Sequence, residues 1–293
     1  MSKHSHLFSL NLIFFFSGFS SLIYQIVWQR LLTLYYGVGA VSIVLIVSVY
    51  MLGLGIGALW GGHLAEKVKA PVRLYFWIEL ILGLFGLGSL SFITFLGRST
   101  AGSPYMVVFI LEFLFLCVPT FFMGMTLPLL VKAFNRWTED FFISVSSLYF
   151  INTLGAAVGA LVASYVIISL FGLDVGIYTA AFLNFFLAGA IYELNGRLPK
   201  ATLSDRSKEE GVILGPIVYF LVLITGFLAI GYEIIWYRVI GILIKDSPYA
   251  FSSILSVYLL GIALGSFGTK STCIANPIIA GMSFFFFYSS LSD

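Results

Sequence analysis

Ser17-Gly-Phe-Ser-Ser-Leu-Ile-Tyr-Gln-Ile-Val-Trp-Gln-Arg30 has a second copy 208 positions further along the chain, Thr225-Gly-Phe-Leu-Ala-Ile-Gly-Tyr-Glu-Ile-Ile-Trp-Tyr-Arg238. The same offset, without a gap, aligns Ser48-Val-Tyr-Met-Leu-Gly-Leu-Gly-Ile-Gly57 with Ser256-Val-Tyr-Leu-Leu-Gly-Ile-Ala-Leu-Gly265. Both copies are strongly apolar. A repeat of this kind in a membrane chain indicates two halves built on one plan, which is the architecture of many secondary transporters.

The alignment is not an effect of aliphatic composition. Between Gly18 and Leu59, 13 of 42 positions are identical in the second copy. The identical positions include three pairs of large side chains, which are Tyr24 and Tyr232, Trp28 and Trp236, and Arg30 and Arg238. Because Tyr, Trp and Arg are not interchangeable with aliphatic residues, their alignment indicates a duplicated structural unit.

The composition is that of an integral membrane protein. Hydrophobic residues make up 60% of the chain and charged residues 10%, and the mean hydropathy is +1.05. Several apolar runs reach about 18 residues, enough to cross a hydrocarbon core about 30 Å thick. We expect residues 7–34 to remain as a span rather than to be cleaved as a signal peptide. The expected partner is the lipid bilayer, and we expect no cofactor, metal ion or nucleic acid.

Hydropathy predicts an all-α polytopic protein with about eight or nine transmembrane helices. The eight predicted helices span residues 7–33, 39–62, 73–96, 105–131, 142–169, 175–194, 213–243 and 248–269. With the N-terminus inside, the inner segments hold 11 of the 15 Lys and Arg residues and the outer segments hold 4. The positive-inside rule therefore predicts a cytoplasmic N-terminus, in a bacterial inner membrane.

The chain divides at its one long polar stretch. Residues 195–211 carry seven charges in 17 residues and are expected to form a cytoplasmic linker. Residues 7–194 then form a complete first half of six helices. Residues 212–293 form a truncated second half, with two helices and a short apolar tail. Its last apolar run, residues 277–288, is shorter than the ~20 residues of a usual span.

Three stretches, together with the repeat, resemble a known family. They are Pro119-Thr-Phe-Phe-Met-Gly-Met-Thr-Leu-Pro-Leu-Leu130, Leu148-Tyr-Phe-Ile-Asn-Thr-Leu-Gly-Ala-Ala-Val-Gly-Ala-Leu161 and the loop Gly62-His-Leu-Ala-Glu-Lys67. The chain resembles the membrane region of the bacterial fused MFS/spermidine synthase proteins, and the loop is similar to a major facilitator signature. The resemblance implies a fold like that of the major facilitator superfamily (MFS), joined in the family to a soluble aminopropyltransferase-like domain.

The chain departs from the family in two respects. The Glu that the family carries in the first repeat is Gln25 here, which removes a protonation role from that position. No Gly-rich nucleotide-binding turn after a strand is found either, so we expect no catalytic residues in this chain.

The repeated aromatic element supplies the main candidate site. One interpretation is that Tyr24, Gln25 and Trp28 line a cavity opposite their copies Tyr232, Glu233 and Trp236, with a solute or proton bound between them. The alternative is an aromatic belt at the headgroups, in which Arg30 reaches the interface.

Three carboxylates lie within predicted spans. Glu79, Glu112 and Glu233 carry a cost of a few kcal/mol if charged in the bilayer, so each is a candidate solute or proton site. The alternative is a structural pairing within the helix bundle. Gly62, Glu66 and Lys67 form a candidate conformational loop that latches one state, and the alternative for them is an ordinary positively charged loop.

The glycine spacing has a structural interpretation. Gly53 and Gly57, and likewise Gly155 and Gly159, are four residues apart. Small residues at this spacing let helix backbones approach closely in a membrane. Gly261 and Gly265 repeat the first set in the second half.

The predicted function is transporter-like movement of a small cationic solute such as a polyamine, because embedded carboxylates and aromatic faces suit ammonium groups. Two alternatives remain open. One is a membrane anchor for a separately encoded spermidine synthase-like domain, and the other is a truncated remnant.

Overall fold

The computed structural model describes residues 3–36, 40–100, 103, 105–138, 141–197, 216–243 and 249–275. These residues are almost entirely helical, and they include no strand. The helices are α1 (Lys3–Tyr36), α2 (Ala40–Lys67), α3 (Pro71–Ser99), α4 (Tyr105–Thr138), α5 (Phe141–Val162), a π-helix (Ala163–Ile168), α6 (Ser169–Phe171), α7 (Leu173–Arg197), α8 (Pro216–Leu243) and α9 (Ala250–Ala275).

All eight predicted helices are confirmed among the described residues. Eight segments are long and apolar enough to cross a membrane, and α5, the π-helix and α6 together form the fifth. Gly172, whose φ of 90° suits a residue without a Cβ, separates the fifth span from α7. The predicted linker lies almost wholly outside the described residues, as does the apolar run 277–288. The protein is therefore a multi-pass membrane protein.

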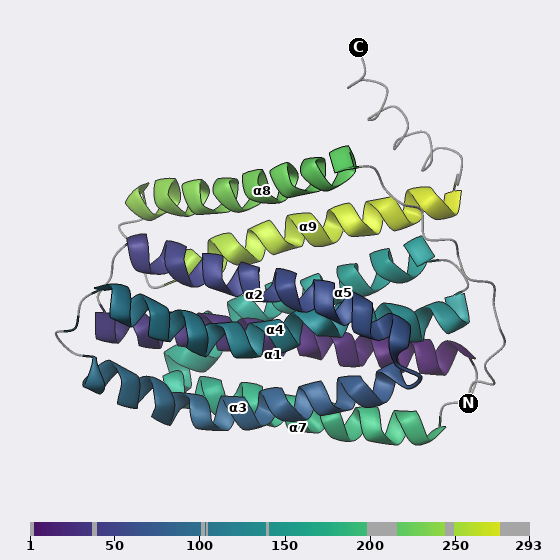
Figure 1. The fold of residues 1–293 in the computed structure, drawn as a ribbon, viewed down its shortest axis with the longest axis horizontal. Coiled ribbons are helices and arrows are strands. Elements are labelled where there is room, and N and C mark those ends of the chain that lie inside the picture. The colour runs from purple at the N-terminus through teal and green to yellow at the C-terminus, as the bar shows by residue number, and fades with distance from the viewer. Residues whose placement is uncertain are drawn as a thin grey trace, which may run out of the picture.

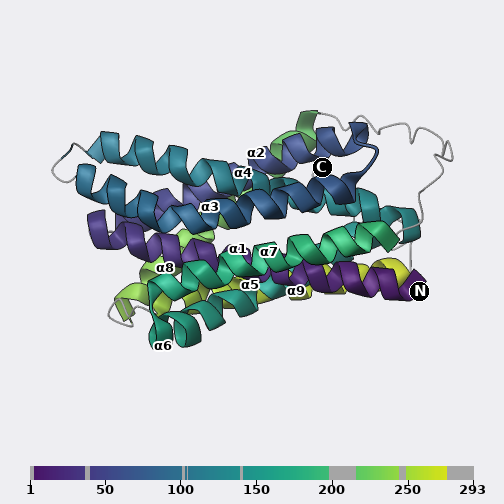
Figure 2. The same ribbon diagram turned by 90° about the horizontal axis from the view of Figure 1, so that it is seen from below.

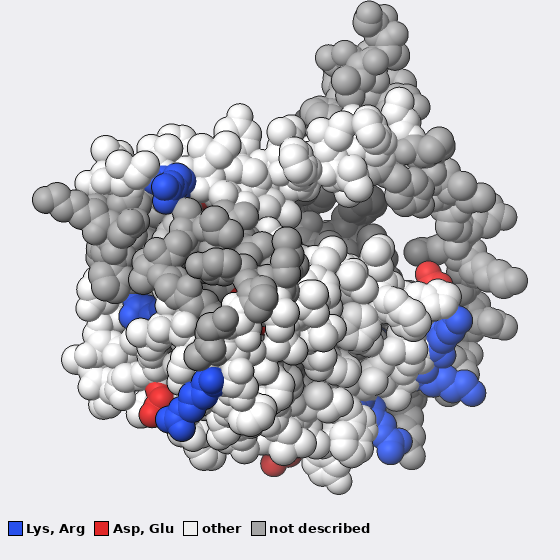
Figure 3. Space-filling view, turned by 60° about the vertical axis from the view of Figure 1, so that its left-hand side comes forward, with Lys and Arg blue, Asp and Glu red and all other residues white. Residues whose placement is uncertain are grey.

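The spans lie side by side in successive layers (Figure 1). The layer of α3 and α7 is followed by α1 and α4, then by α2 and α5, and finally by α9 and α8. The view from below shows α1 next to α7 and α3 (Figure 2). On the face shown in Figure 3, most of the described surface is uncharged, and Lys, Arg, Asp and Glu form only a few small groups. This surface suits contact with lipid.

The first six spans pack in a pattern with an internal symmetry. Within these six spans, the most extensive helix–helix interfaces are those of α2 with α4, of α1 with α5, and of α3 with α7. Smaller interfaces join α1 to α7 and α3 to α4. Exchanging α1 with α4, α2 with α5 and α3 with α7 leaves these five pairings unchanged. The six-helix unit therefore has the contact pattern of two three-helix repeats.

The predicted glycine stripes lie at two of these contacts. A Cβ on Gly57 would collide with the backbone of Phe121 in α4, and one on Gly155 would collide with the backbone of Phe15 in α1. The close approach of α2 to α4 and of α5 to α1 thus requires glycine. The structural interpretation is confirmed for Gly57 and Gly155, whereas Gly261 and Gly265 have open space at the Cβ position among the described residues.

The long repeat is also visible as a repeated hydrogen bond. In the first copy the Tyr50 hydroxyl of α2 donates to the Ser21 carbonyl of α1 over 3.1 Å. In the second, the Tyr258 hydroxyl of α9 donates to the Ala229 carbonyl of α8 over 3.2 Å. Donor and acceptor are each displaced by the same 208 positions, so the pair α8–α9 repeats a contact of the pair α1–α2.

The two copies differ in their surroundings. In the most apolar window of α1, 50% of the residues are buried, but only 6% are buried in that of α8. The main core draws side chains from α1, α2, α3, α4, α5 and α7, with Phe251 and Leu255 added by α9. Among the described side chains of α8, only Tyr237 packs against this core. The helices that enclose α1 have no counterparts around α8 in the described part of the chain.

Candidate functional site

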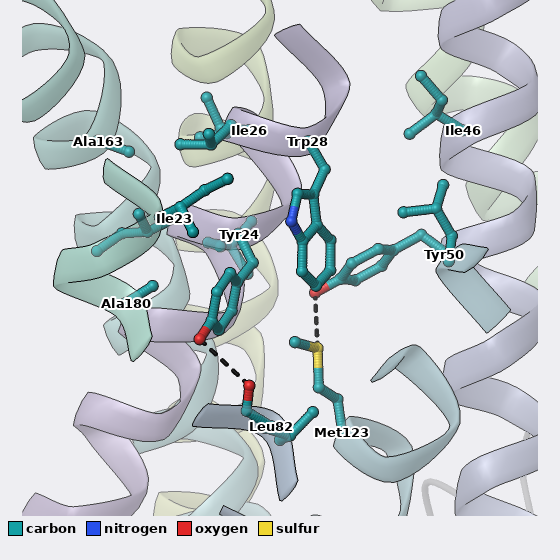
Figure 4. Close-up of a cluster of buried hydrophobic side chains, with 14 of the residues drawn as sticks. Ile23, Tyr24, Ile26, Trp28, Ile46, Tyr50, Leu82, Met123, Ala163 and Ala180 are labelled. Atoms are coloured by element: carbon teal, nitrogen blue, oxygen red, sulfur yellow. Dashed lines mark hydrogen bonds between the residues drawn. The ribbon is translucent and has the colours of Figure 1, made fainter. Parts of the chain in front are cut away.

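Tyr24 and Trp28 of α1 lie in the interior of the six-helix unit (Figure 4). Their rings stack with centroids 4.8 Å apart. The Tyr24 hydroxyl donates to the Leu82 carbonyl of α3 over 3.4 Å, and the Trp28 indole N–H donates to the Ser89 hydroxyl over 3.1 Å. With Trp28 only 1% exposed, these two residues do not form an aromatic belt. They bind α1 to α3.

Tyr232 and Trp236 have the same local sequence and the opposite environment. They are 61% and 55% exposed on α8. The structure therefore does not bring them together with Tyr24 and Trp28, as the cavity interpretation required. The physical reason is that α3 and α4 cover the aromatic face of α1, whereas among the described elements α8 is flanked mainly by α9.

Gln25 and Glu233 are equivalent positions in the repeat, and both are buried. Gln25 lies in the core, and its Nε2 has no hydrogen-bond partner among the described residues. Glu233 of α8 lies near Tyr258 of α9, which in turn lies near Tyr149 of α5. Glu233 thus belongs to a junction where the second repeat meets the six-helix unit.

Glu79 of α3 is fully buried and faces α1. The Ser17 hydroxyl donates to Glu79 Oε1 over 2.6 Å, and the Tyr75 side chain lies beside both groups. Glu112, on α4, is also buried. Within the described residues no hydrogen bond or ion pair joins any two of Glu79, Glu112 and Glu233, so the three carboxylates do not form one site.

The loop after α2 is held from α4. The Lys132 ammonium donates to the carbonyl oxygens of Ala65, Glu66 and Val68, the last two over 3.0 and 3.3 Å. A cation at a helix C-terminus compensates the partial negative charge of its free carbonyl groups. The side chains of Glu66 and Lys67 are exposed, and Gly62 has open space around its Cα. Lys132 thus holds the backbone at this helix end, and the conformational latch of Gly62, Glu66 and Lys67 stays a prediction.

A polar contact that the sequence analysis missed joins α9 to the π-helix. Ser164 and Tyr165 of the π-helix hydrogen-bond to Ser252 and Ser253 of α9. From α1, the Arg30 guanidinium donates to the Ser164 hydroxyl over 3.3 Å. These residues form the α5–α9 seam, and π-helical turns of this kind are frequent at functional sites.

Further along the seam, the Ser256 hydroxyl donates to the Ala157 carbonyl of α5 over 2.9 Å. The Arg30 guanidinium also lies 5.9 Å from the ring centre of Tyr249, so it points into the seam rather than to a headgroup. The sequence signal was the row Ser252, Ser253 and Ser256, which places hydroxyls on one side of an otherwise apolar helix.

Within the described part of the chain, no three His, Cys, Asp or Glu side chains gather in a way that could hold a metal ion. Comparison with protein-family models, curated proteins and solved structures finds no match to this chain. The embedded polar residues are therefore the features of the chain that bear on its function.

Proposed function

We propose that this protein is a transporter that moves a small cationic solute, with Glu233 as the carboxylate that receives the cation. The observation that carries the proposal is the position of Glu233. It is a buried carboxylate between α8 and its neighbours, and Tyr258 of α9 lies near it. Among the described residues no Lys or Arg pairs with it. A cation from outside the protein would supply the missing charge.

The surroundings of Glu233 favour an organic ammonium group. Tyrosine rings attract cations through their π faces, and the phenol oxygens of Tyr258 and Tyr149 can accept hydrogen bonds from N–H groups. Tyr149 is partly exposed at the edge of the junction, and entry of the solute past this ring is part of the proposal. A polyamine, with several ammonium groups separated by methylenes, fits a carboxylate bordered by aromatic rings.

The helix arrangement supports an MFS-like build. MFS halves contain two three-helix repeats of inverted topology and are related to each other as parallel repeats, with solutes bound between the halves. The symmetric packing of α1–α7, the repeated hydrogen bond of α8–α9 and the position of Glu233 at their junction all agree with that plan. Together with the resemblance to the fused MFS/spermidine synthase membrane region, and with the Lys and Arg distribution, they support placement in a bacterial inner membrane with a cytoplasmic N-terminus.

Binding of spermidine to the purified full chain in lipid nanodiscs tests the proposal. In Glu233→Gln we expect spermidine affinity to fall by at least about tenfold, the equivalent of ~1.4 kcal/mol. In the wild type, affinity should weaken as pH falls, because a proton and the cation compete for one carboxylate. Glu233→Gln should lose this pH dependence. Isothermal titration calorimetry at several pH values measures both effects.

Asp174→Asn is the matched control, because Asp174 is an exposed acid at the start of α7. It removes the same charge without touching the junction, and spermidine affinity should stay unchanged. Equal binding by wild type and Glu233→Gln across the pH range would overturn the assignment and leave Glu233 as a structural carboxylate.

A further inference from the structure

A second polar cluster lies inside the six-helix unit, away from the proposed solute site. It consists of Ser17 on α1 and of Tyr75 and Glu79 on α3, all of them buried. Ser17 donates to Glu79 Oε1 over 2.6 Å. Glu79 Oε2 and the Tyr75 hydroxyl are buried without a well-aligned hydrogen bond, although Tyr75 lies next to Glu79. Two buried oxygens that lie next to each other are therefore without a well-aligned partner, in a place where the carboxylate charge is remote from water.

No charged group among the described residues neutralises Glu79. Arg73, on the same helix, is exposed and six residues away, about 120° around an ideal helix. The titratable groups that face Glu79 are Tyr75 on its own helix and Tyr24 from α1, and neither supplies a positive charge. A lone carboxylate in such a place carries a desolvation cost that one Ser hydrogen bond does not offset.

A proton on Glu79 removes the buried charge that no described group neutralises. The neutral carboxyl is then a donor through Oε2 and an acceptor through Oε1. Ser17 already donates to Oε1, and the Tyr75 oxygen is the acceptor next to Oε2. We propose that Glu79, Ser17 and Tyr75 form a proton-binding site, in which Ser17 and Tyr75 hold the two oxygens of the protonated carboxyl. This site does not depend on solute binding at Glu233.

A metal cation fits the cluster less well. Ions such as Na⁺ in membrane transporters draw carbonyl ligands from unwound helix segments. Here α1 and α3 run without interruption through Ser17, Tyr75 and Glu79, so their backbone carbonyl oxygens remain engaged in helix hydrogen bonds. The cluster offers only side-chain oxygens from three residues, which suits a proton.

The site also lies where α1 and α3 are held together. Tyr24 donates to the Leu82 carbonyl, three residues beyond Glu79, and Trp28 donates to Ser89 further along. Loss of the proton would place a negative charge in this contact and weaken the packing of α1 on α3. In a transporter, such a site couples proton uptake to the arrangement of two helices.

Infrared spectroscopy of the full chain in nanodiscs tests the proposal, because a protonated carboxyl has a C=O band separate from that of a carboxylate and shifts in D₂O. We expect the difference spectrum between wild type and Glu79→Gln at neutral pH to contain this carboxyl band. The difference between wild type and Glu193→Gln, an exposed acid on α7, should contain a carboxylate band instead. A carboxylate band for Glu79 would overturn the proposal. A Glu79 band that changes when Na⁺ is added would also overturn it, because it would indicate a metal cation at the site.

Tyr75→Phe is a second variant that keeps Glu79 and nearly the same volume. Removal of the acceptor should move the Glu79 carboxyl band to higher frequency, because its O–H loses a hydrogen bond. Tyr192→Phe, at an exposed tyrosine of α7, should leave the band in place. An unmoved band in folded Tyr75→Phe protein would show that the Oε2 proton is not held by Tyr75 and would overturn this geometry.

Discussion

At the scale of residues, the protein shows that one local sequence can serve two environments. Trp28 and Trp236 stand in copies of the same element, yet the first is enclosed by α3 and α4 and the second is largely exposed on α8. Their roles follow from what surrounds them. Trp28 contributes buried area, two edge-to-face ring contacts and a hydrogen bond, whereas Trp236 contributes mainly contact with lipid.

Truncation of the two tryptophans should therefore have very different effects. Trp28→Ala removes a buried aromatic ring, a change that typically costs about 3–5 kcal/mol of stability. Trp236→Ala should change stability by less than about 1 kcal/mol, in keeping with an exposed position. Unfolding by SDS in mixed micelles, followed by circular dichroism, measures both. Similar losses for the two variants would mean that α8 is enclosed as tightly as α1.

At the scale of elements, apolar length predicted the helices and glycine spacing predicted residues of their close contacts, but not which helices are paired. The spans were predictable because each must cover the hydrocarbon core, and Gly57 and Gly155 because only small residues permit close helix approach. The clamp of Lys132 on the Ala65 carbonyl was not predictable, since it joins residues 67 positions apart through a backbone atom. The same holds for the α5–α9 seam, whose hydroxyls give no long-range signal.

The glycine contact of α2 gives a test at this scale. Gly57→Leu should prevent close packing of α2 on α4, because even a Cβ would collide with the Phe121 backbone. Its equivalent in the second repeat, Gly265, has open space at the Cβ position. Gly265→Leu should therefore be tolerated. Size-exclusion chromatography in detergent should show a lower yield of folded monomer for Gly57→Leu alone. Equal yields would contradict the α2–α4 contact.

At the scale of the whole molecule, consecutive spans alternate in direction, so the charged ends of the helices fall on two sides of the membrane (Figure 1). Lys67, Lys69 and Arg73 lie together near the turn from α2 to α3, and Arg98 lies at the opposite end of α3. The helix arrangement fixes which ends share a side. The helix packing does not say which side is cytoplasmic, because the same bundle could be inserted either way up. The prediction of the cytoplasmic side rests on the imbalance of basic residues.

Cysteine labelling of intact cells decides the orientation. With the native cysteines replaced, a cysteine introduced at Ser99, at the end of α3, should react with a membrane-impermeant maleimide added outside. One introduced at Ser207, which lies outside the described residues, should react only after the cells are opened. The expectation rests on the 11 to 4 distribution of basic residues. Strong labelling of position 207 in intact cells would reverse the orientation.

The hydrogen bond repeated in the two helix pairs has a consequence for how the two copies of a duplication diverge in sequence. Its donor is a tyrosine side chain, but its acceptor is a backbone carbonyl, which every residue type possesses. Mutation can therefore exchange the acceptor residue freely, as Ser21 and Ala229 show, while the tyrosine must stay. A contact of this kind therefore persists after one of its two positions has changed residue type. The common origin of the two copies should thus stay recognisable in the pairing of their helices after their sequence identity has fallen.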